Sequence, residues 1–311
     1  MKWEKLGLVF DLSLHRPNWL KSHAMTPTPI LIENIVRVYF AGRDEKGVSN
    51  ISFVDFDKNE PTRVLYVHDR PVMEIGKPGM FDDSGTICTC AIQSGDEVFI
   101  YYTGYSVSSK VPYRNAVGLG VSKDGGFSFS RAYDGPIVDR TKSEPYFTIS
   151  PWVIKHGKDW HMWYASATDW LEVEGKLESI YHIKYASSSD GKEWRQENVS
   201  CIAPIDLEEA NAKPSVLVEG DTLKMWFTYR GSRDFRDGID SYQLGYAEAP
   251  VQNPTSWKRL DKNFQKEIGP RHNYDLNMQA YPSVICIENK KHLFYNGNGF
   301  GIDGFCLMRE T

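Results

Sequence analysis

A hairpin pattern that recurs five times along this chain limits its possible folds more than any other feature. Each copy has an extended segment, often with a proline, then a tight polar turn, then a strand of aromatic and β-branched residues. These second strands read VRVYFAG (36–42), VFIYYTG (98–104), WHMWYAS (160–166), LKMWFTY (223–229) and HLFYNG (292–297). The turn residues Asn34, Gly95, Gly157, Gly220 and Asn289 are 61, 62, 63 and 69 residues apart. Five units therefore account for the whole chain of 311 residues.

Each unit has a second half that is also made of short strands. Third strands are visible as NAVGLGVS (115–122), YHIKYAS (181–187) and YQLGYA (242–247). Fourth strands begin with an aromatic residue, as in Phe129-Ser130-Arg131, Trp194-Arg195-Gln196 and Trp257-Lys258-Arg259. Because no stretch has convincing helical spacing of apolar residues, the pattern predicts an all-β chain with four antiparallel strands per unit. Five such units predict a single five-bladed β-propeller domain spanning residues 1–311.

The two ends of the chain indicate how the ring closes. The last unit runs out after its third strand, at Leu307-Met308. The missing fourth strand is found at the other end, where Trp3-Glu4-Lys5-Leu6 repeats the pattern of residues 257–260. We therefore expect the N-terminal strand to complete the last blade and to remove the exposed edge of an open array.

Charge and composition exclude several classes of function. The formal net charge is −5, with 36 Lys and Arg against 41 Asp and Glu, so no uniformly basic surface is available for nucleic acid. The charged N-terminus does not resemble a signal peptide, and no window resembles a membrane span. The sequence therefore predicts a cytoplasmic protein that acts away from membranes. Five cysteines without a C-x-x-C motif favour reduced structural thiols over disulfides or a zinc site, and we expect no cofactor.

The topology of a blade places polar residues from every unit at one mouth of the axis. In an antiparallel blade, the starts of the first strands and the loops between second and third strands share one face of the ring. The candidate residues on this face are His23, Arg43, Asp82, Asp83, Tyr105, Arg114, Glu144, Glu209, Lys213, Arg230, Gln279, Tyr281 and Asn298. A mouth with carboxylates, amides, aromatic rings and arginines suits a polyhydroxylated substrate, because sugars need paired donors and acceptors and an aromatic platform.

Glycoside cleavage needs two carboxyl groups on opposite sides of the anomeric carbon. Asp82 or Asp83, together with Glu144 on the neighbouring inner strand, could meet this demand. The alternative is that these residues only form polar turns before their strands. Glu209 is a weaker candidate, and His23 is a candidate for proton transfer at the start of the first blade.

Two further motifs are expected to be structural. The segment from Ser122 to Phe129 fits the S-x-D-x-G-x-x-aromatic pattern of an Asp box, and residues 189–194 form a shortened version. In such hairpins the Asp binds turn amides on the face away from the substrate. The alternating glycines of Gly297–Gly301 follow no βα unit, so we reject a dinucleotide site and expect a tight loop at the rim.

The chain resembles the five-bladed propeller glycosidase superfamily of arabinanases, β-xylosidases, invertases and mannoside phosphorylases. The residues that carry the resemblance are Phe81-Asp82-Asp83, Glu144-Pro145 and the loop Tyr295-Asn296-Gly297-Asn298. His23-Ala24 and the segments 37–40 and 181–186 are similar to an uncharacterised bacterial group of glycosidase-like propellers associated with surface-polysaccharide genes.

The resemblance implies a base Asp on blade one, an orienting Asp on blade two and an acid Glu on blade three. Asp82 or Asp83 and Glu144 match the second and third positions, whereas His23 stands where the base Asp belongs. The expected function is therefore cleavage or transfer of a glycosidic or sugar-phosphate bond in bacterial glycan metabolism. Hydrolysis with inversion at the anomeric carbon is one form of this reaction. Two alternatives stay open. One is a phosphorylase that holds phosphate with basic residues, and the other is a glycan-binding propeller without catalysis.

The arginines at the mouth also indicate the charge of the substrate. Arg43, Arg114 and Arg230 are expected on one rim, and guanidinium groups match both carboxylates and phosphates. The sequence therefore predicts a carbohydrate partner with an anionic group, such as a uronic carboxylate or a phosphate.

Overall fold

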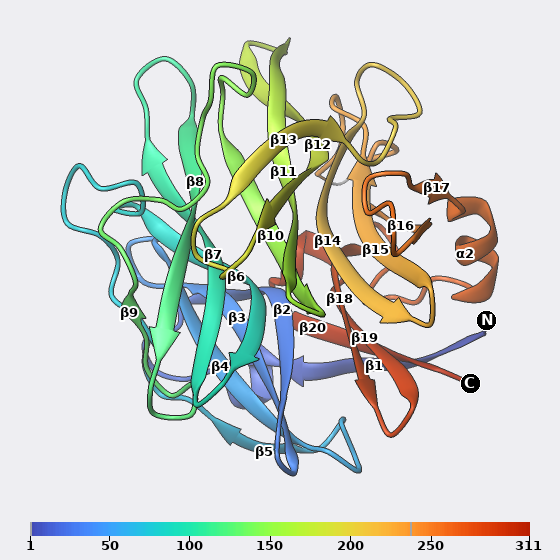
Figure 1. Ribbon diagram of the computed structural model, residues 1–311. Helices are drawn as coiled ribbons and strands as arrows, with labels where there is room; N and C mark the ends of the chain where they lie inside the picture. The colour runs from blue at the N-terminus through green and yellow to red at the C-terminus, as the bar shows by residue number, and fades with distance from the viewer. Residues whose placement is uncertain (1, 237) are drawn as a thin grey trace.

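The computed structural model, which describes residues 2–236 and 238–311, confirms the predicted ring of five antiparallel blades (Figure 1). Blade 1 consists of β2 (Ser22–Ile32), β3 (Ile35–Arg43), β4 (Ser49–Asp57) and β5 (Val64–Val67). Blade 2 consists of β6 (Gly85–Ser94), β7 (Glu97–Val107), β8 (Tyr113–Ser122) and β9 (Ser130–Arg131). A single parallel bridge between Ser49 and Gly85 joins these two blades into one sheet.

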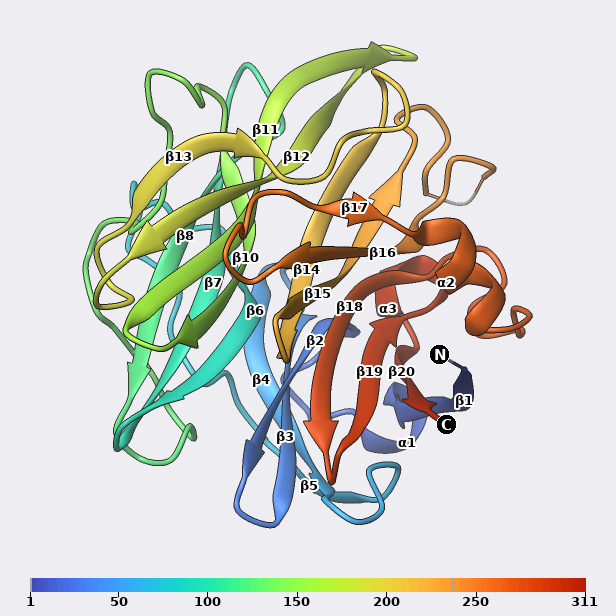
Figure 2. The ribbon, with the colours of Figure 1, turned by 45° about the vertical axis from the view of Figure 1, so that its right-hand side comes forward.

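Blades 3 and 4 are separate four-stranded sheets. Blade 3 consists of β10 (Thr148–His156), β11 (Asp159–Val173), β12 (Lys176–Ser188) and β13 (Arg195–Ser200). Blade 4 consists of β14 (Ala210–Glu219), β15 (Thr222–Arg230), β16 (Gln243–Pro250) and β17 (Lys258–Arg259). The hairpin of β11 and β12 has strands of 15 and 13 residues, so it extends beyond its blade, as Figure 2 shows at the top of the molecule.

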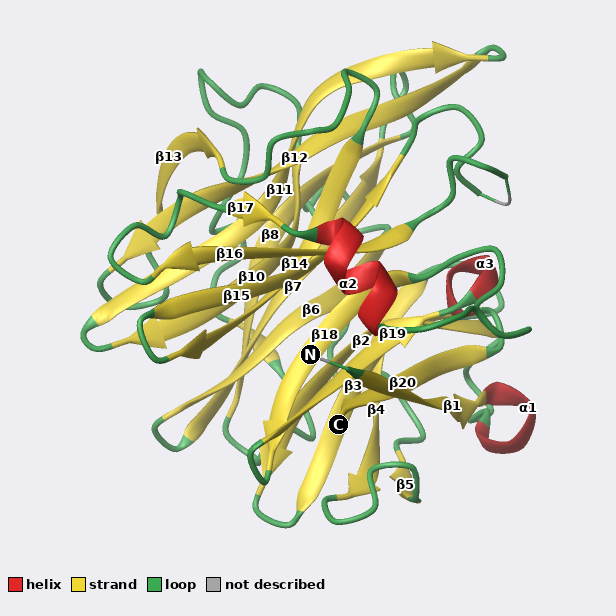
Figure 3. Cartoon of the chain, turned by 90° about the vertical axis from the view of Figure 1, so that its right-hand side faces the viewer, coloured by secondary structure: helices red, strands yellow, loops and turns green. Residues whose placement is uncertain are grey.

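Blade 5 is closed by the N-terminal strand, as the sequence predicts. It consists of β18 (Ala280–Ile287), β19 (Lys290–Asn296), β20 (Gly304–Glu310) and β1 (Trp3–Asp11), and β1 pairs with β20 along its length. The two ends of the chain therefore lie side by side (Figure 3). The inner strands contact one another in the order β2, β6, β10, β14 and β18, and β18 contacts β2 again, so the ring is closed.

In the described part of the chain, three short helices interrupt the strands where the apolar pattern predicted none. They are α1 (Leu12–His15), α2 (Asp261–Glu267) and α3 (Asn298–Gly301). The helix α2 buries one face, where the Phe264 ring lies 6.1 Å from the ring of Trp3. Such a short helix is stabilised by this contact rather than by its own sequence, which explains why periodicity missed it. No described helix is long and apolar enough to cross a membrane.

The aromatic second strands fill the space between blades. The Asp box of blade 2 also contacts blade 1, because the Tyr39 hydroxyl on β3 donates to Gly126 O at 2.8 Å. Trp163, Trp226 and Tyr164 are fully buried. Asp124 accepts hydrogen bonds from the backbone N–H groups of Phe127 and Ser128, both at 3.0 Å, which confirms its predicted turn role. All five cysteines are free thiols, and Cys286 is the exposed one.

Candidate functional site

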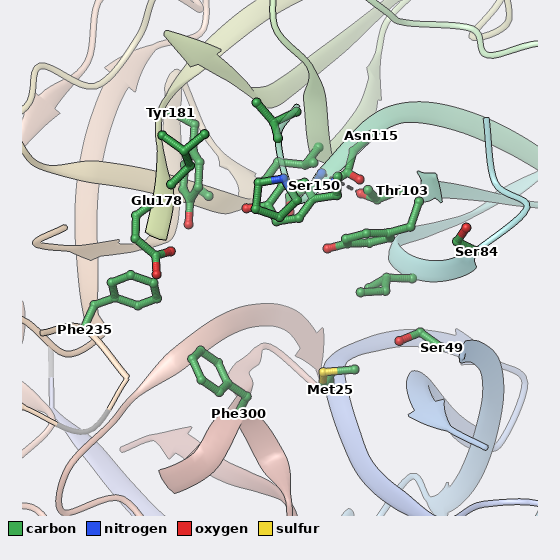
Figure 4. Close-up of a pocket in the computed structure, with 18 of the residues that line it drawn as sticks. Met25, Ser49, Ser84, Thr103, Asn115, Ser150, Glu178, Tyr181, Phe235 and Phe300 are labelled. Carbon is green, nitrogen blue, oxygen red and sulfur yellow. Dashed lines mark hydrogen bonds between the residues drawn. The ribbon is translucent and has the colours of Figure 1, made fainter. Parts of the chain in front are cut away.

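The axis opens at one end into a cavity of about 870 Å³, a size that suits a small ligand such as a sugar unit. All five blades contribute lining residues, and the close-up in Figure 4 shows several of their side chains around a common space. The labelled examples are Met25 and Ser49 of blade 1, Ser84, Thr103 and Asn115 of blade 2, Ser150, Glu178 and Tyr181 of blade 3, Phe235 of blade 4, and Phe300 of blade 5.

A repeated bulge decides which residues of the inner strands meet this cavity. In four blades a residue with positive φ precedes a proline, and the pairing register shifts at that point: Thr26 (φ 52°), Ser150 (53°), Lys213 (49°) and Tyr281 (56°). Non-glycine residues adopt this conformation only when their surroundings hold them there. Thr103 holds Ser150 in this conformation, because the N–H of Ser150 donates to the threonine Oγ1 at 2.9 Å. Asn296 holds Thr26 in the same way, because its Oδ1 accepts from the N–H of Thr26 at 2.8 Å.

Aromatic rings form a large part of the wall. Tyr281 and Phe300 stack with ring centroids 6.3 Å apart, and Tyr242 lies edge-on to Phe300 at 5.4 Å. Phe300 has φ +58°, so the short turn of α3 presents this ring from a strained backbone. On blade 2, Tyr105 lies 6.1 Å from Tyr113. Flat rings next to polar groups are the surfaces on which sugar C–H faces pack.

The charged residues of the lining are mostly cationic. The cations are Arg43, Lys110, Lys176, Arg230 and Arg236, and Glu178 is the one acidic residue among the described lining residues. Glu178 forms an ion pair with Arg236, which donates to its two oxygens at 2.7 and 3.2 Å. The other four cations form no ion pair with a described carboxylate. The cavity therefore carries an excess of positive charge that an anionic ligand would neutralise.

Arg230 is the buried member of this set, with 3% of its surface exposed. Its Nε donates to the hydroxyls of both Tyr181 and Tyr242 at 3.2 Å, and its Nη2 donates to Ser179 O at 2.8 Å. The guanidinium also lies over the Phe235 ring at 3.9 Å. These contacts hold a positive charge in the wall without a carboxylate, and they orient the two tyrosine hydroxyls.

Four of the residues expected at the mouth do line the cavity: Arg43, Tyr105, Arg230 and Tyr281. Burial raises the pKa of Tyr105 and of Tyr281, so both hydroxyls stay protonated at neutral pH. Arg114 is exposed on β8 and does not line the cavity.

The two carboxylates expected to form a catalytic pair are not among the lining residues. Asp82 is fully buried and accepts hydrogen bonds from Tyr102 at 3.0 Å and from Arg131 at 2.8 Å. Glu144 is also buried, and both of its oxygens lie 2.9 Å from the Tyr164 hydroxyl. Each carboxylate is thus bound inside its own blade, and the structure does not bring the two together around the cavity.

These contacts belong to a pattern that the blades repeat. Asp82, Glu144 and Asp275 each accept a hydrogen bond from a tyrosine twenty residues later in the chain. Asp275 also forms a buried ion pair with Lys5 at 2.6 Å. In blade 4, Glu209 instead binds Arg259 directly at 2.8 Å. Recurrence in separate blades favours a structural role, in which the carboxylate ties the start of an inner strand to its blade.

The remaining candidates also have internal partners. Asp83 accepts from the N–H of Gly79 at 2.9 Å, and Gln279 donates to Asp275 at 2.7 Å. Asn298 binds the backbone N–H of Asn277 at 2.8 Å and shapes the rim loop. None of the three lines the cavity.

His23 and Lys213 lie near the axis without lining the cavity. Burial, assisted by Arg43, lowers the pKa of His23 to about 4, so its ring is neutral at neutral pH. Its Nδ1 lies 2.8 Å from Ser22 Oγ. Burial lowers the pKa of Lys213 to about 7, and its Nζ donates to Ser283 Oγ at 2.7 Å. Lys213 therefore links the inner strands of blades 4 and 5.

Several lining residues were missed by the sequence reasoning. Glu178 and Lys176 reach the cavity because the hairpin of β11 and β12 is unusually long, and Phe235 comes from the loop before β16. The alternation of apolar and charged residues in Leu171-Glu172-Val173-Glu174, directly before Gly175, was the available signal for this longer hairpin. No cluster of His, Cys, Asp and Glu suited to a metal ion occurs in the described ranges 2–236 and 238–311.

Comparison with known proteins identifies relatives over the full length. Two uncharacterised proteins from two strains of Mycobacterium tuberculosis are each 32% identical over 309 residues, which is 99% of this chain and 98% of theirs. No protein family model matches the chain.

Solved structures show the same fold at much lower identity. A protein in complex with RGII superposes with a TM-score of 0.72 at 15% identity, covering 99% of this chain and 91% of its own. A thermostable family-43 glycoside hydrolase superposes with a TM-score of 0.67 at 12% identity, covering 94% of this chain and 90% of its own. A structure from the GH130 family of mannoside phosphorylases, a family that contains glycoside hydrolases targeting β-1,2 mannosidic linkages in Candida mannan, superposes with a TM-score of 0.63. Its sequence identity is 14%, and the match covers 94% of this chain and 84% of its own.

Proposed function

Because this chain belongs to the same protein family as the two mycobacterial proteins and has the fold of five-bladed propeller glycosidases and phosphorylases, we propose that it binds and processes an anionic carbohydrate in the axial cavity. The ligand class is a sugar that carries a carboxylate or a phosphate. The fold supports the carbohydrate, and the lining of the cavity supports the negative charge.

The observation that carries this proposal is the set of cations without acidic partners around a ring-lined space. Arg43, Lys110, Lys176 and Arg230 face the cavity without ion pairs to described carboxylates. A ligand with a negative charge gains their attraction without breaking an existing pair. The rings of Tyr281 and Phe300 supply the apolar surface for the sugar itself.

The number of carboxylates favours phosphorolysis over hydrolysis as the reaction of this cavity. Hydrolysis with two carboxylates needs an acid for the leaving oxygen and a second group for water or the anomeric carbon. Glu178 is the one carboxylate of the described lining, and it is paired with Arg236. In phosphorolysis, an oxygen of hydrogen phosphate bonds to the anomeric carbon as the glycosidic C–O bond breaks. The proton of that phosphate passes to the leaving oxygen, so the products are a sugar 1-phosphate and a free hydroxyl. The phosphate, held by cations, thus replaces the second carboxylate.

Binding of simple sugars tests the ligand class. We expect glucuronate, galacturonate and glucose 1-phosphate to bind at least about tenfold more tightly than glucose and galactose in calorimetry, with affinity that falls as salt increases. The variants Arg43→Gln and Lys176→Gln should each reduce this preference. Lys123→Gln is the matched control, because Lys123 is an exposed cation of the Asp-box turn outside the cavity. Equal affinity for neutral and anionic sugars would overturn the proposal.

A reaction assay separates phosphorolysis from hydrolysis. Manno- and galacturono-oligosaccharides are incubated with the protein in the presence and absence of inorganic phosphate, and products are identified by mass spectrometry. Phosphorolysis predicts sugar phosphates that form only with phosphate. Release of free reducing sugar without phosphate would show hydrolysis instead, whereas binding without any product would leave recognition as the function.

A further inference from the structure

Asn115 lies on β8, the third strand of blade 2, and lines the axial cavity. It pairs in register with Tyr105 on β7, so the two side chains lie on the same face of the sheet. Thr103, two residues before Tyr105, shares that face because strand side chains alternate. Figure 4 shows Asn115 and Thr103 together at the edge of the cavity that faces blade 3.

The carboxamide oxygen of Asn115 has no partner in the described part of the protein. The residue is 4% exposed, and its Oδ1 is buried without a hydrogen bond. A dozen buried side-chain atoms lack partners in the described ranges, but Asn115 Oδ1 is the one that belongs to a lining residue of the cavity. Folded proteins rarely leave such an oxygen unpaired, because its lost hydration is not recovered.

The surroundings of this oxygen limit what could bind to it. An acceptor oxygen needs a donor, and a cationic donor is disfavoured because the cavity already holds an excess of cations. A neutral donor is left, and a carbohydrate supplies hydroxyl groups. The half-buried Tyr105 ring, opposite Asn115 in register, offers an apolar surface beside the amide.

We propose that Asn115 is a hydroxyl-binding residue of the cavity, whose Oδ1 accepts a hydrogen bond from a hydroxyl of the bound sugar while the sugar ring packs near Tyr105. This inference rests on the proposed function and adds a specificity-determining contact to it. The anionic group of the ligand and the hydroxyl bound by Asn115 are recognised by different residues, so the two requirements can be tested separately.

The variant Asn115→Leu tests the inference through stability as well as affinity. Leucine has a similar size and removes the unpaired oxygen, so the unliganded variant should have an unchanged Tm or one raised by about 1–3 °C. Its affinity for the tightest-binding probe among glucuronate, galacturonate and glucose 1-phosphate should fall about tenfold or more. A residue that serves only the fold would show the opposite stability change.

Asn296→Leu is the matched control for stability. Asn296 is a fully buried asparagine whose carboxamide is satisfied by Thr26 N at 2.8 Å, Ala24 O at 2.8 Å and Gly304 O at 3.0 Å. This variant should lower the Tm by several degrees, because it leaves those backbone groups unpaired.

The outcomes separate this inference from the proposed function. If Asn115→Leu lowers the Tm as much as Asn296→Leu, or binds the probe as tightly as the wild-type protein, the hydroxyl-binding role is overturned. If none of the three anionic sugars binds the wild-type protein, the proposed function itself fails, and the inference fails with it.

Discussion

Tyr102 donates a hydrogen bond of 3.0 Å to Asp82 across a separation of twenty residues, the same separation at which Tyr164 donates to Glu144. Asp82 also binds the largely buried Arg131. We therefore expect Asp82→Asn to lower the free energy of unfolding by about 3 kcal/mol, because it leaves a guanidinium without its carboxylate. Glu144→Gln, which has no cation to leave unpaired, should cost about 1 kcal/mol. Urea denaturation measures both changes.

The same two variants decide between a structural and a catalytic role for these carboxylates. A structural role predicts that carbohydrate affinity and turnover per folded molecule stay close to those of the wild-type protein. Unchanged stability combined with loss of turnover in both variants would instead support the catalytic pair that the sequence predicted.

The sequence was sufficient to predict the ring, its closure and the face that holds the cavity, because each depends on a pattern that repeats. It could not show which polar residues point into the cavity. Asp82 and Ser150 both belong to the entry region of an inner strand, yet Asp82 turns into its blade towards Tyr102 and Arg131. Ser150 reaches the cavity because a bulge with positive φ shifts the strand register. The contribution of Glu178 depends on hairpin length, which repeat spacing does not encode.

Lys213 should make the stability of the protein depend on pH. Its pKa in the folded protein is lowered by burial to about 7 from the usual lysine value of 10.5. Between these values the unfolded chain binds more protons, so stability should rise with pH by up to about 1.4 kcal/mol per unit. We expect Lys213→Met to flatten this rise between pH 7 and about 8.5. Thiols of the unfolded chain also ionise near about pH 8.5, but they are the same in both proteins and cancel in the comparison of slopes. Parallel slopes of unfolding free energy for variant and wild type would contradict the expectation.

Closure of the ring should depend on the first strand. Deletion of residues 1–9 removes most of β1, the contact of Trp3 with Trp226 and the partner of Asp275. We expect the Tm to fall by many degrees, because the edge of β20 and its apolar face become exposed. The point variant Lys5→Met keeps the strand and leaves the buried Asp275 carboxylate without its cation, which should cost about 3 kcal/mol. An unchanged Tm in the deletion variant would mean that the ring does not need β1.

His23 should lower the stability of the folded protein in mild acid and should not affect that stability at neutral pH. Its pKa is lowered to about 4 by burial and by Arg43, from the usual histidine value of 6.5. The unfolded chain therefore takes up a proton that the folded protein resists, and stability should fall as pH decreases from 6.5 towards 4. Asparagine tolerates the positive φ of 67° at this position and does not titrate. We expect His23→Asn to raise the Tm relative to the wild type at about pH 5 and to leave it nearly unchanged at about pH 8, as thermal unfolding at the two values would show. A Tm difference of equal size at both values would instead mean that packing, not protonation, accounts for the effect of His23.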